Sequence, residues 1–247
     1  MRIRLIGCEV IIRELCDAVT RSPHIVDAQF LSKGLHDLGA QAMRGALQAA
    51  IDEVEECASK YDAIALGYGL CGNGLAGIEA RSTALVLPRA HDCITLLFGS
   101  RTKFERYFQD HPGVYYRSSG WVERGADLEP LARTQTGMGY TLDALIERYG
   151  EDNGRFLYDE LTRYRQTYEQ LTFIETGIEP DDRFEAQARA EAAEKGWRFE
   201  KLKGNLGLFR GLLSGDWDDA SYLVVPPGHR IVARPDQGIV AAERIMP

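Results

Sequence analysis

The sequence has no long apolar run, and this excludes a membrane-spanning chain. None of its segments approaches the roughly 20 apolar residues that a transmembrane helix requires. The apolar start of the chain is interrupted by Glu9 and Arg13, and no small-residue cleavage site follows, so no signal peptide is predicted. We expect no membrane partner.

Cysteine is scarce and unevenly placed. The chain has five cysteines, and none follows Cys93. An odd number at irregular spacing is a poor disulfide framework and fits a reducing, cytoplasmic environment. The cysteines are therefore expected to be free thiols or metal ligands.

An excess of positive charge is also missing. The 29 Lys and Arg residues are outnumbered by 37 Asp and Glu residues, which gives a formal net charge of -8. Such a chain lacks the excess of Lys and Arg that binds a phosphate backbone, so a nucleic-acid partner is not expected. The 247 residues, 45% of them hydrophobic, can bury a sizeable core in one large domain or in two lobes.

Apolar runs alternate with segments of helical spacing along the whole chain. Such alternation predicts an α/β fold with mainly parallel strands and right-handed crossovers. The expected strands are residues 3–8, 25–31, 61–66, 83–87, 113–117, 171–174, 198–203 and 222–225. The expected helices are residues 9–20, 43–58, 94–108, 183–195 and 206–213, with a further helix that carries Leu157, Leu161, Tyr164, Tyr168 and Leu171 on one face.

This pattern divides into two similar halves. We predict two Rossmann-like lobes with a cleft between them: an N-terminal lobe of residues 1–125, and residues 126–247 as a helical crossover and second lobe. Glu175 and His229 end or follow strands of the second half and are weaker candidates for that cleft. Both are more often turn or capping residues.

Three cysteines and one histidine follow predicted strands of the first half. Cys8 follows the first strand, Cys71 the third, and His91 and Cys93 the fourth. Ligands of open parallel sheets bind beyond the carboxyl ends of the strands, so these residues are expected at one edge. Cys16 and Cys57 lie instead on apolar faces of predicted helices and are interpreted as packing residues.

The loop around Cys71, GYGLCGNGLAG, is rich in glycine. Such a loop allows close approach of a ligand to the backbone, and we predict cofactor contacts at Gly69, Gly72, Asn73 and Gly74. The alternative is that Cys71 is a small buried residue in a tight turn. The loop also matches a dinucleotide-binding fingerprint, but it follows the third strand and opens no helix, so a nicotinamide or flavin is not favoured.

His91 and Cys93 form an H-x-C step. In an extended strand end, residues two apart point the same way, so an imidazole and a thiolate would converge. With Cys71 they could bind zinc and leave its fourth position open, as in catalytic sites. Alternatively, Cys8, Cys71 and Cys93 could hold an iron-sulfur cluster. The structural alternative is that His91 bonds to the backbone and Cys93 begins a buried helix face.

The segments GLCGNGL, PRAHDCITLLFGS, GLFRGLLSGDW and VVPPGH resemble the domain-of-unknown-function family DUF1638 of bacteria and archaea, nearly end to end. Members of that family often occur beside corrinoid-dependent methyltransferase systems. The H-x-C step with a distant cysteine also resembles zinc methyltransferases that transfer a methyl group to a thiol. In this chain Cys71 precedes the step, and the expected fold is not their barrel.

These observations lead to one functional hypothesis and one alternative. The chain is expected to be a zinc-dependent enzyme of corrinoid-linked methyl-group or one-carbon metabolism, with Cys71, His91 and Cys93 as ligands, Cys8 nearby and a small-molecule substrate. The alternative is a non-catalytic accessory protein that binds a corrinoid, metal or iron-sulfur cluster for a partner methyltransferase.

Overall fold

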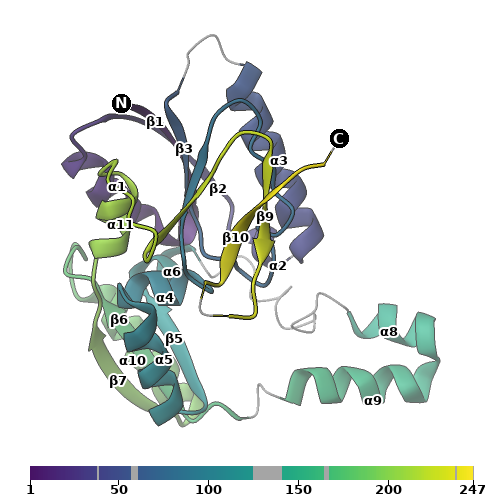
Figure 1. Cartoon of the computed structure of the whole chain (residues 1–247). Coiled ribbons are helices and arrows are strands. Elements are labelled where there is room, and N and C mark those ends of the chain that lie inside the picture. Colours follow the sequence, from purple (N-terminus) through teal and green to yellow (C-terminus); the bar gives the residue numbers. More distant parts are fainter. Residues whose placement is uncertain (38, 57–60, 125–140, 164–166, 237, 247) are drawn as a thin grey trace.

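The computed structural model describes residues 1–37, 39–56, 61–124, 141–163, 167–236 and 238–246. These residues form a mixed α/β fold with three sheets (Figure 1). The largest sheet has the order β2-β1-β3-β4-β8. Its strands are β1 (Arg2–Cys8), β2 (Ile25–Leu31), β3 (Ala63–Gly67), β4 (Leu85–Pro88) and β8 (Tyr222–Val225). The first four are parallel, and β8 runs antiparallel to β4.

Helices cover both faces of this sheet, which explains why β3 and β4 are buried along their whole length. One face packs against α3 (Ala40–Glu56) through side chains that include Leu47 and Ile51. The other face packs against α1 (Ile12–Arg21), which follows the short helix η1 (Glu9–Ile11), and against α11 (Gly207–Leu212), with Leu15 and Phe209 in the core. The core is therefore a three-layer sandwich.

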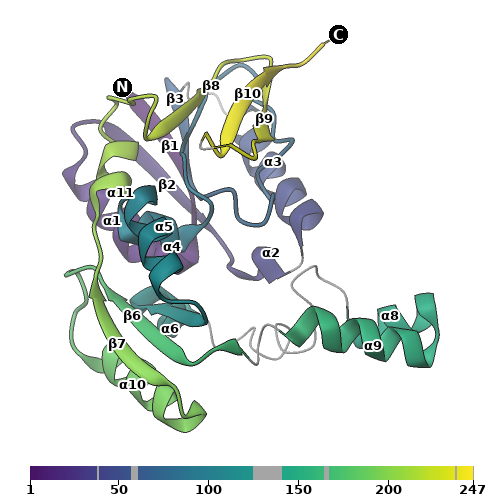
Figure 2. The same ribbon diagram turned by 60° about the horizontal axis from the view of Figure 1, so that its bottom comes forward.

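A second, smaller sheet has the order β5-β6-β7 and is parallel throughout. It consists of β5 (Val114–Ser118), β6 (Gln170–Glu175) and β7 (Arg198–Lys203). Successive residues of β6 face opposite sides: Phe173 packs with α10 (Arg183–Lys195), whereas Ile174 joins the core of the main sheet. Figure 2 shows α10 on the outer side of this sheet.

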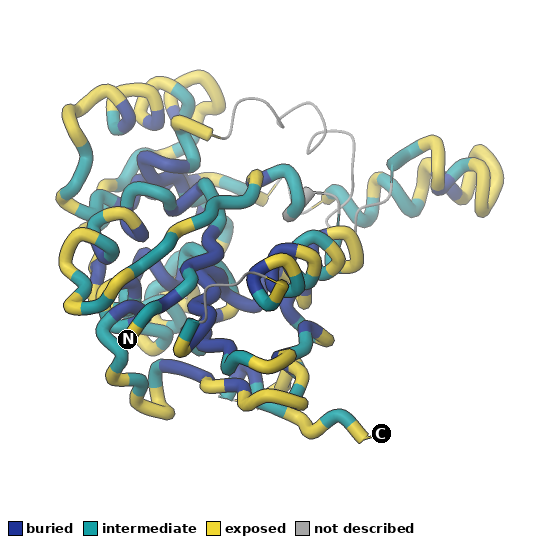
Figure 3. Tube along the Cα trace, turned by 90° about the horizontal axis from the view of Figure 1, so that it is seen from above, coloured by how far each residue is buried: buried dark blue, intermediate teal, exposed yellow. Residues whose placement is uncertain are grey.

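The remaining elements lie outside these two sheets. The strands β9 (His229–Ala233) and β10 (Val240–Arg244) form an antiparallel hairpin, and α2 (Gly34–Asp37) and α6 (Ser119–Arg124) are short. The helices α8 (Leu142–Tyr149) and α9 (Glu151–Thr162) form a hairpin that stands away from the sheets, with most of its surface exposed or half-buried (Figure 3). Within the described residues, no helix is both long and apolar enough to span a bilayer.

The α/β class and the mainly parallel main sheet predicted from the sequence are confirmed. One predicted element is wrong, because the helix expected at 94–108 is two helices, α4 (Cys93–Phe98) and α5 (Arg101–Asp110). Gly99 ends α4 with a left-handed φ of 68°, and the Ser100 side chain caps α5 by accepting a hydrogen bond from the N–H of Lys103.

The extension of the following helix to Tyr168 is also wrong. The helix α9 ends at Thr162, and Tyr168 packs edge-on against Tyr115 and Trp197 instead. Tyr164, expected on the same helical face, lies outside the described residues.

Both the main sheet and the smaller parallel sheet contain strands from either side of residue 125, the predicted boundary between the two lobes. The strand β5, expected in the first lobe, pairs with β6 in the smaller sheet, and β8, expected in the second lobe, pairs with β4 in the main sheet. The chain thus leaves the main sheet after β4 and returns at β8 to cover its edge. Local periodicity carries no information on such long-range pairing.

Candidate functional site

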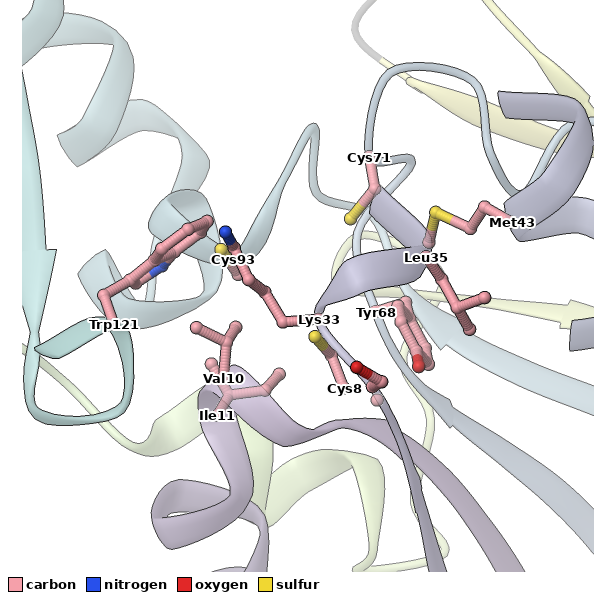
Figure 4. Close-up of a pocket in the computed structure, with 12 residues that line it drawn as sticks. Cys8, Val10, Ile11, Lys33, Leu35, Met43, Tyr68, Cys71, Cys93 and Trp121 are labelled. Atoms are coloured by element: carbon pink, nitrogen blue, oxygen red, sulfur yellow. The ribbon is translucent and has the colours of Figure 1, made fainter. Parts of the chain in front are cut away.

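A small cavity of about 20 Å³ lies beyond the carboxyl ends of the parallel strands. This is the edge where ligands of open α/β sheets bind. Figure 4 shows its lining residues, which come from the segments that follow β1, β2 and β3 and from α3, α4 and α6. They are Cys8, Val10, Ile11, Ser32, Lys33, Leu35, Met43, Gly67, Tyr68, Cys71, Cys93 and Trp121.

The sheet itself brings three thiols to this cavity. Cys8 is the last residue of β1, Cys71 follows β3, and Cys93 begins the helix after β4. In Figure 4, Cys8 and Cys71 lie on one side of the cavity and Cys93 lies with Trp121 on the other. The described lining contains no residue beyond Trp121, so the cavity is built from the N-terminal half of the chain.

Cys71 has a backbone conformation that L-residues other than Asn and Asp rarely adopt. Its φ is 47°, and the next two residues, Gly72 and Asn73, have φ values of 61° and 69°. Glycine and asparagine tolerate this left-handed region, whereas a cysteine there costs about 1–2 kcal/mol. Unfavourable backbone of this kind is concentrated at functional sites, because the surrounding structure must hold it in place.

Gly69 allows the Cys71 loop to pack directly on the segment before α4. A Cβ at Gly69 would lie 2.6 Å from the backbone nitrogen of Asp92. Beside this contact, the N–H of Leu70 donates to the carbonyl of Ala90, and the N–H of Cys71 donates to the carbonyl of His91, both at 2.8 Å. The loop after β3 is thereby fixed to the chain after β4.

The other predicted cofactor contacts lie elsewhere on this loop. Gly74 packs against the Met43 thioether, and Gly72 and Asn73 are exposed. None of the four residues predicted to contact a cofactor lines the cavity. The glycine-rich composition is explained by close packing and left-handed backbone within the loop.

His91 and Cys93 do not share one face of a strand, so the geometric argument from the H-x-C step is wrong. The strand β4 ends at Pro88, and the Asp92 carboxylate caps α4 by accepting a 2.8 Å hydrogen bond from the N–H of Thr95. The chain has therefore turned before Cys93 begins the helix. Cys93 lines the cavity, whereas His91 is exposed and contributes no lining atom.

Burial keeps the thiols of Cys71 and Cys93 in their neutral form. It raises the pKa of Cys71, with further contributions from Cys8 and then Asp92. Burial likewise raises the pKa of Cys93, followed by the proximity of Cys71. The Trp121 indole opposes this effect by interacting with the Cys93 sulfur. Without a bound cation, these thiols are weak nucleophiles at neutral pH.

Several polar residues of the cavity were not predicted from the sequence, Lys33, Tyr68 and Trp121 among them. Lys33 is only 5% exposed, and its ammonium nitrogen lies 5.1 Å from the ring centre of Trp121. Its side chain extends between the Cys8 and Cys93 sides of the cavity (Figure 4). Among the described residues, the Tyr68 hydroxyl and the Trp121 Nε1 are buried without a well-aligned hydrogen bond. Lys33 lies two residues beyond β2. The rule that ligands of open parallel sheets bind beyond the carboxyl ends of the strands, called the strand-end rule below, could therefore have identified it.

The remaining sequence candidates lie away from the cavity. Cys16 is exposed on α1, so its interpretation as a packing residue is wrong, and Cys57 lies outside the described residues. Glu175 ends β6 and accepts a 3.0 Å hydrogen bond from Lys201, and His229 begins β9 with its Nδ1 3.1 Å from the Pro227 carbonyl. Within the described ranges, no three His, Cys, Asp or Glu side chains are already arranged to hold a metal ion.

Comparison with known proteins places the chain in a family. A family model described as "Protein of unknown function (DUF1638)" matches residues 30–213, about three quarters of the chain. The match contains Cys71, His91 and Cys93 and begins after Cys8. No curated protein and no solved structure matches this chain. The extent of the family match shows that the chain belongs to the DUF1638 family.

Proposed function

We propose that Cys8, Cys71 and Cys93 bind a zinc ion, and that the protein uses it to activate a thiol or another small substrate in methyl-group or one-carbon metabolism. The observation that carries this proposal is the convergence of three thiols on one cavity at the ligand-binding edge of the main sheet. Thiolates are preferred ligands of zinc and other soft cations.

The left-handed backbone at Cys71 supports the ligand role. A glycine or asparagine would fit this position better, as the neighbouring Gly72 and Asn73 illustrate. A cysteine that only packed would gain little from such a place. A cysteine that must direct its sulfur toward a metal has a reason to be there.

Charge and size favour a single ion over a cluster. Three thiolates and one Zn²⁺ carry one net negative charge, which the buried Lys33 ammonium beside the cavity offsets. The cavity of about 20 Å³ has room for roughly one water-sized centre, which suits one ion better than a cube of iron and sulfur.

Ligation requires the side chains to rearrange. The three sulfurs have to turn toward a common centre by changing χ1 rotamers, and the Lys33 side chain has to withdraw from between them. Zinc with three protein ligands keeps a fourth position for a substrate atom. A zinc ion held by these cysteines would lower the pKa of a substrate thiol bound there and make it a nucleophile, which is the chemistry that methyl transfer to sulfur requires.

The narrowness of the cavity favours one alternative. A site that closes around one ion leaves little room for a substrate, and this suits an accessory protein that holds a metal, cluster or corrinoid for a partner methyltransferase. Purified protein incubated with methylcobalamin and an excess of a small thiol separates the two. The enzyme gives repeated turnover, whereas the accessory protein binds without it.

Metal analysis of protein purified without oxygen tests the proposal. We expect about one zinc per chain, and loss of most of it in Cys71→Ser and Cys93→Ser variants. Cys16→Ser is the matched control, since Cys16 is exposed on α1 and away from the cavity. A brown protein that contains iron and is bleached by Cys8→Ser would assign the site to a cluster instead.

A further inference from the structure

A second and larger hollow, of about 780 Å³, lies between α5 and the end of β7. Its size falls within the roughly 300–1,000 Å³ of small-molecule sites. It is separated from the three-cysteine cavity by α4, whose first residue, Cys93, lines the cavity and whose last residue, Phe98, lines this hollow. Its position beyond the carboxyl end of β7 is again that of ligand sites in α/β sheets.

The hollow concentrates positive charge on an acidic protein. Its described lining contains Lys103, Arg106 and Lys203, against one carboxylate, that of Asp110. His111 adds an imidazole to the same wall.

Within the described ranges these cations have no carboxylate partners, whereas neighbouring cations are paired. Among the described residues, Lys103, Arg106 and Lys203 form no ion pair. By contrast, Lys201, which lies on β7 with Lys203, forms ion pairs with Glu175 at 3.0 Å and Glu185 at 2.9 Å. An acidic chain that leaves three cations together without carboxylate partners has them available for an anion.

The same hollow has a rigid aromatic wall. The Tyr107 hydroxyl is within 3.0 Å of both Thr172 Oγ1 and Gln170 Nε2, and it donates to the Glu200 carboxylate. These bonds fix the Tyr107 ring. The His111 ring stacks on it with a centroid distance of 4.2 Å and an interplanar angle of 14°.

Asn205 supplies a fixed polar group at the rim. Its backbone N–H donates to the Leu97 carbonyl at 2.8 Å, and its Oδ1 accepts from the N–H of Gly207 at 2.7 Å. These two bonds hold the side chain in place. In the described part of the chain, no hydrogen bond uses its Nδ2 amide, which is thus available as a donor for a ligand oxygen.

We propose that this hollow binds a nucleoside diphosphate or a similar organic phosphate, with the phosphates on Lys103, Arg106 and Lys203 and the planar base beside the Tyr107–His111 stack. Lysine and arginine bind phosphate oxygens through charge-assisted hydrogen bonds. Aromatic faces stack on nucleobases, and this adds affinity that phosphate alone lacks. The assignment is independent of the metal site.

Calorimetric titration of the full-length protein with ADP tests this inference. We expect saturable binding to one site that weakens as salt is raised, and Lys103→Glu and Lys203→Glu variants that bind at least about 10-fold more weakly. Arg198→Glu is the matched control, because it makes the same charge change at the opposite end of β7, about 17 Å away. It should bind ADP within about 2-fold of the unchanged protein.

Each of the following outcomes would overturn the inference. They are no ADP binding by the unchanged protein, equal weakening by Arg198→Glu and Lys203→Glu, and inorganic pyrophosphate binding as tightly as ADP, which would remove the role of the aromatic wall. Circular dichroism of each variant shows that the fold is kept. A retained fold with unchanged ADP affinity in both lysine variants would also contradict it.

Discussion

The backbone N–H of Cys71 donates a 2.8 Å hydrogen bond to the carbonyl oxygen of His91. This bond joins the loop after β3 to the segment after β4, and so places Cys71 and Cys93 on the same cavity. His91 thus contributes to the site through its backbone, while its imidazole is exposed. We therefore expect His91→Ala to leave both the loop and metal binding largely intact, as measured by bound zinc per chain.

The close packing of Gly69 can be tested by adding one methyl group. In Gly69→Ala the new Cβ would lie 2.6 Å from the Asp92 backbone, so the two loops must separate. We expect the free energy of unfolding to fall by about 1–3 kcal/mol in urea denaturation. Gly45→Ala on the exposed face of α3 meets no atom within 4 Å and should instead gain about 0.5–1 kcal/mol. Equal stability of both variants would refute the packing role.

The left-handed backbone of Cys71 predicts an unusual order of stability. Cys71→Gly should be more stable than Cys71→Ala by about 1 kcal/mol, because glycine adopts the φ of 47° without steric cost. At Gly45, inside the helix α3, the opposite order is expected, with alanine more stable than glycine. Thermal unfolding of metal-free protein measures it. An alanine variant as stable as the glycine variant would show that Cys71 is not strained.

Alkylation rates should separate the exposed from the buried cysteines. Cys16 is exposed, whereas Cys71 is buried and its pKa is raised by burial. In metal-free native protein at pH 7, iodoacetamide should modify Cys16 much faster than Cys71 or Cys93. Peptide mapping by mass spectrometry gives the rate at each site. Modification of Cys71 at the rate of Cys16 would contradict the enclosed cavity.

The buried Glu14, which does not line the cysteine cavity, should make the stability of the fold depend on pH. Its side chain is fully buried on α1, its Oε2 has no hydrogen-bond partner among the described residues, and burial raises its pKa to about 7. Because the folded protein holds this proton more tightly than the unfolded chain does, stability is lost as pH rises from about 4.5 through 7.

Glu14→Gln removes this titration. Relative to the unchanged protein, the variant should gain about 3 kcal/mol in unfolding free energy between pH 4.5 and pH 8. Denaturation at several pH values measures the difference, and Glu194→Gln on the exposed face of α10 is the control for loss of one carboxylate. A difference that does not grow with pH would show that Glu14 is ionised in the folded state.

Most elements of the fold could be predicted from the sequence, because their patterns are local. The bounds predicted for β2 and α10 are those that the structure has. The pairing of β8 with β4 could not be predicted, since it joins segments more than a hundred residues apart through tertiary packing. The break at Gly99 had a local signal, a glycine followed by a serine cap, that apolar spacing alone conceals.

The candidate site was predictable in part. The strand-end rule brought Cys8, Cys71 and Cys93 together, because it depends on topology alone. It failed for the His91 imidazole, whose direction is set by the turn that Asp92 makes before α4. Trp121 could not be predicted, because α6 reaches the cavity only through the packing of the folded chain.

The amount of zinc bound by the cysteine variants tests the central claim most directly. Metal-free protein is equilibrated with zinc, freed of excess ion by gel filtration, and analysed for metal and protein. We expect about one zinc per chain for the unchanged protein and for Cys16→Ser, and almost none when Cys8, Cys71 and Cys93 are all replaced by serine. A correctly folded triple variant that keeps its full zinc content would contradict it.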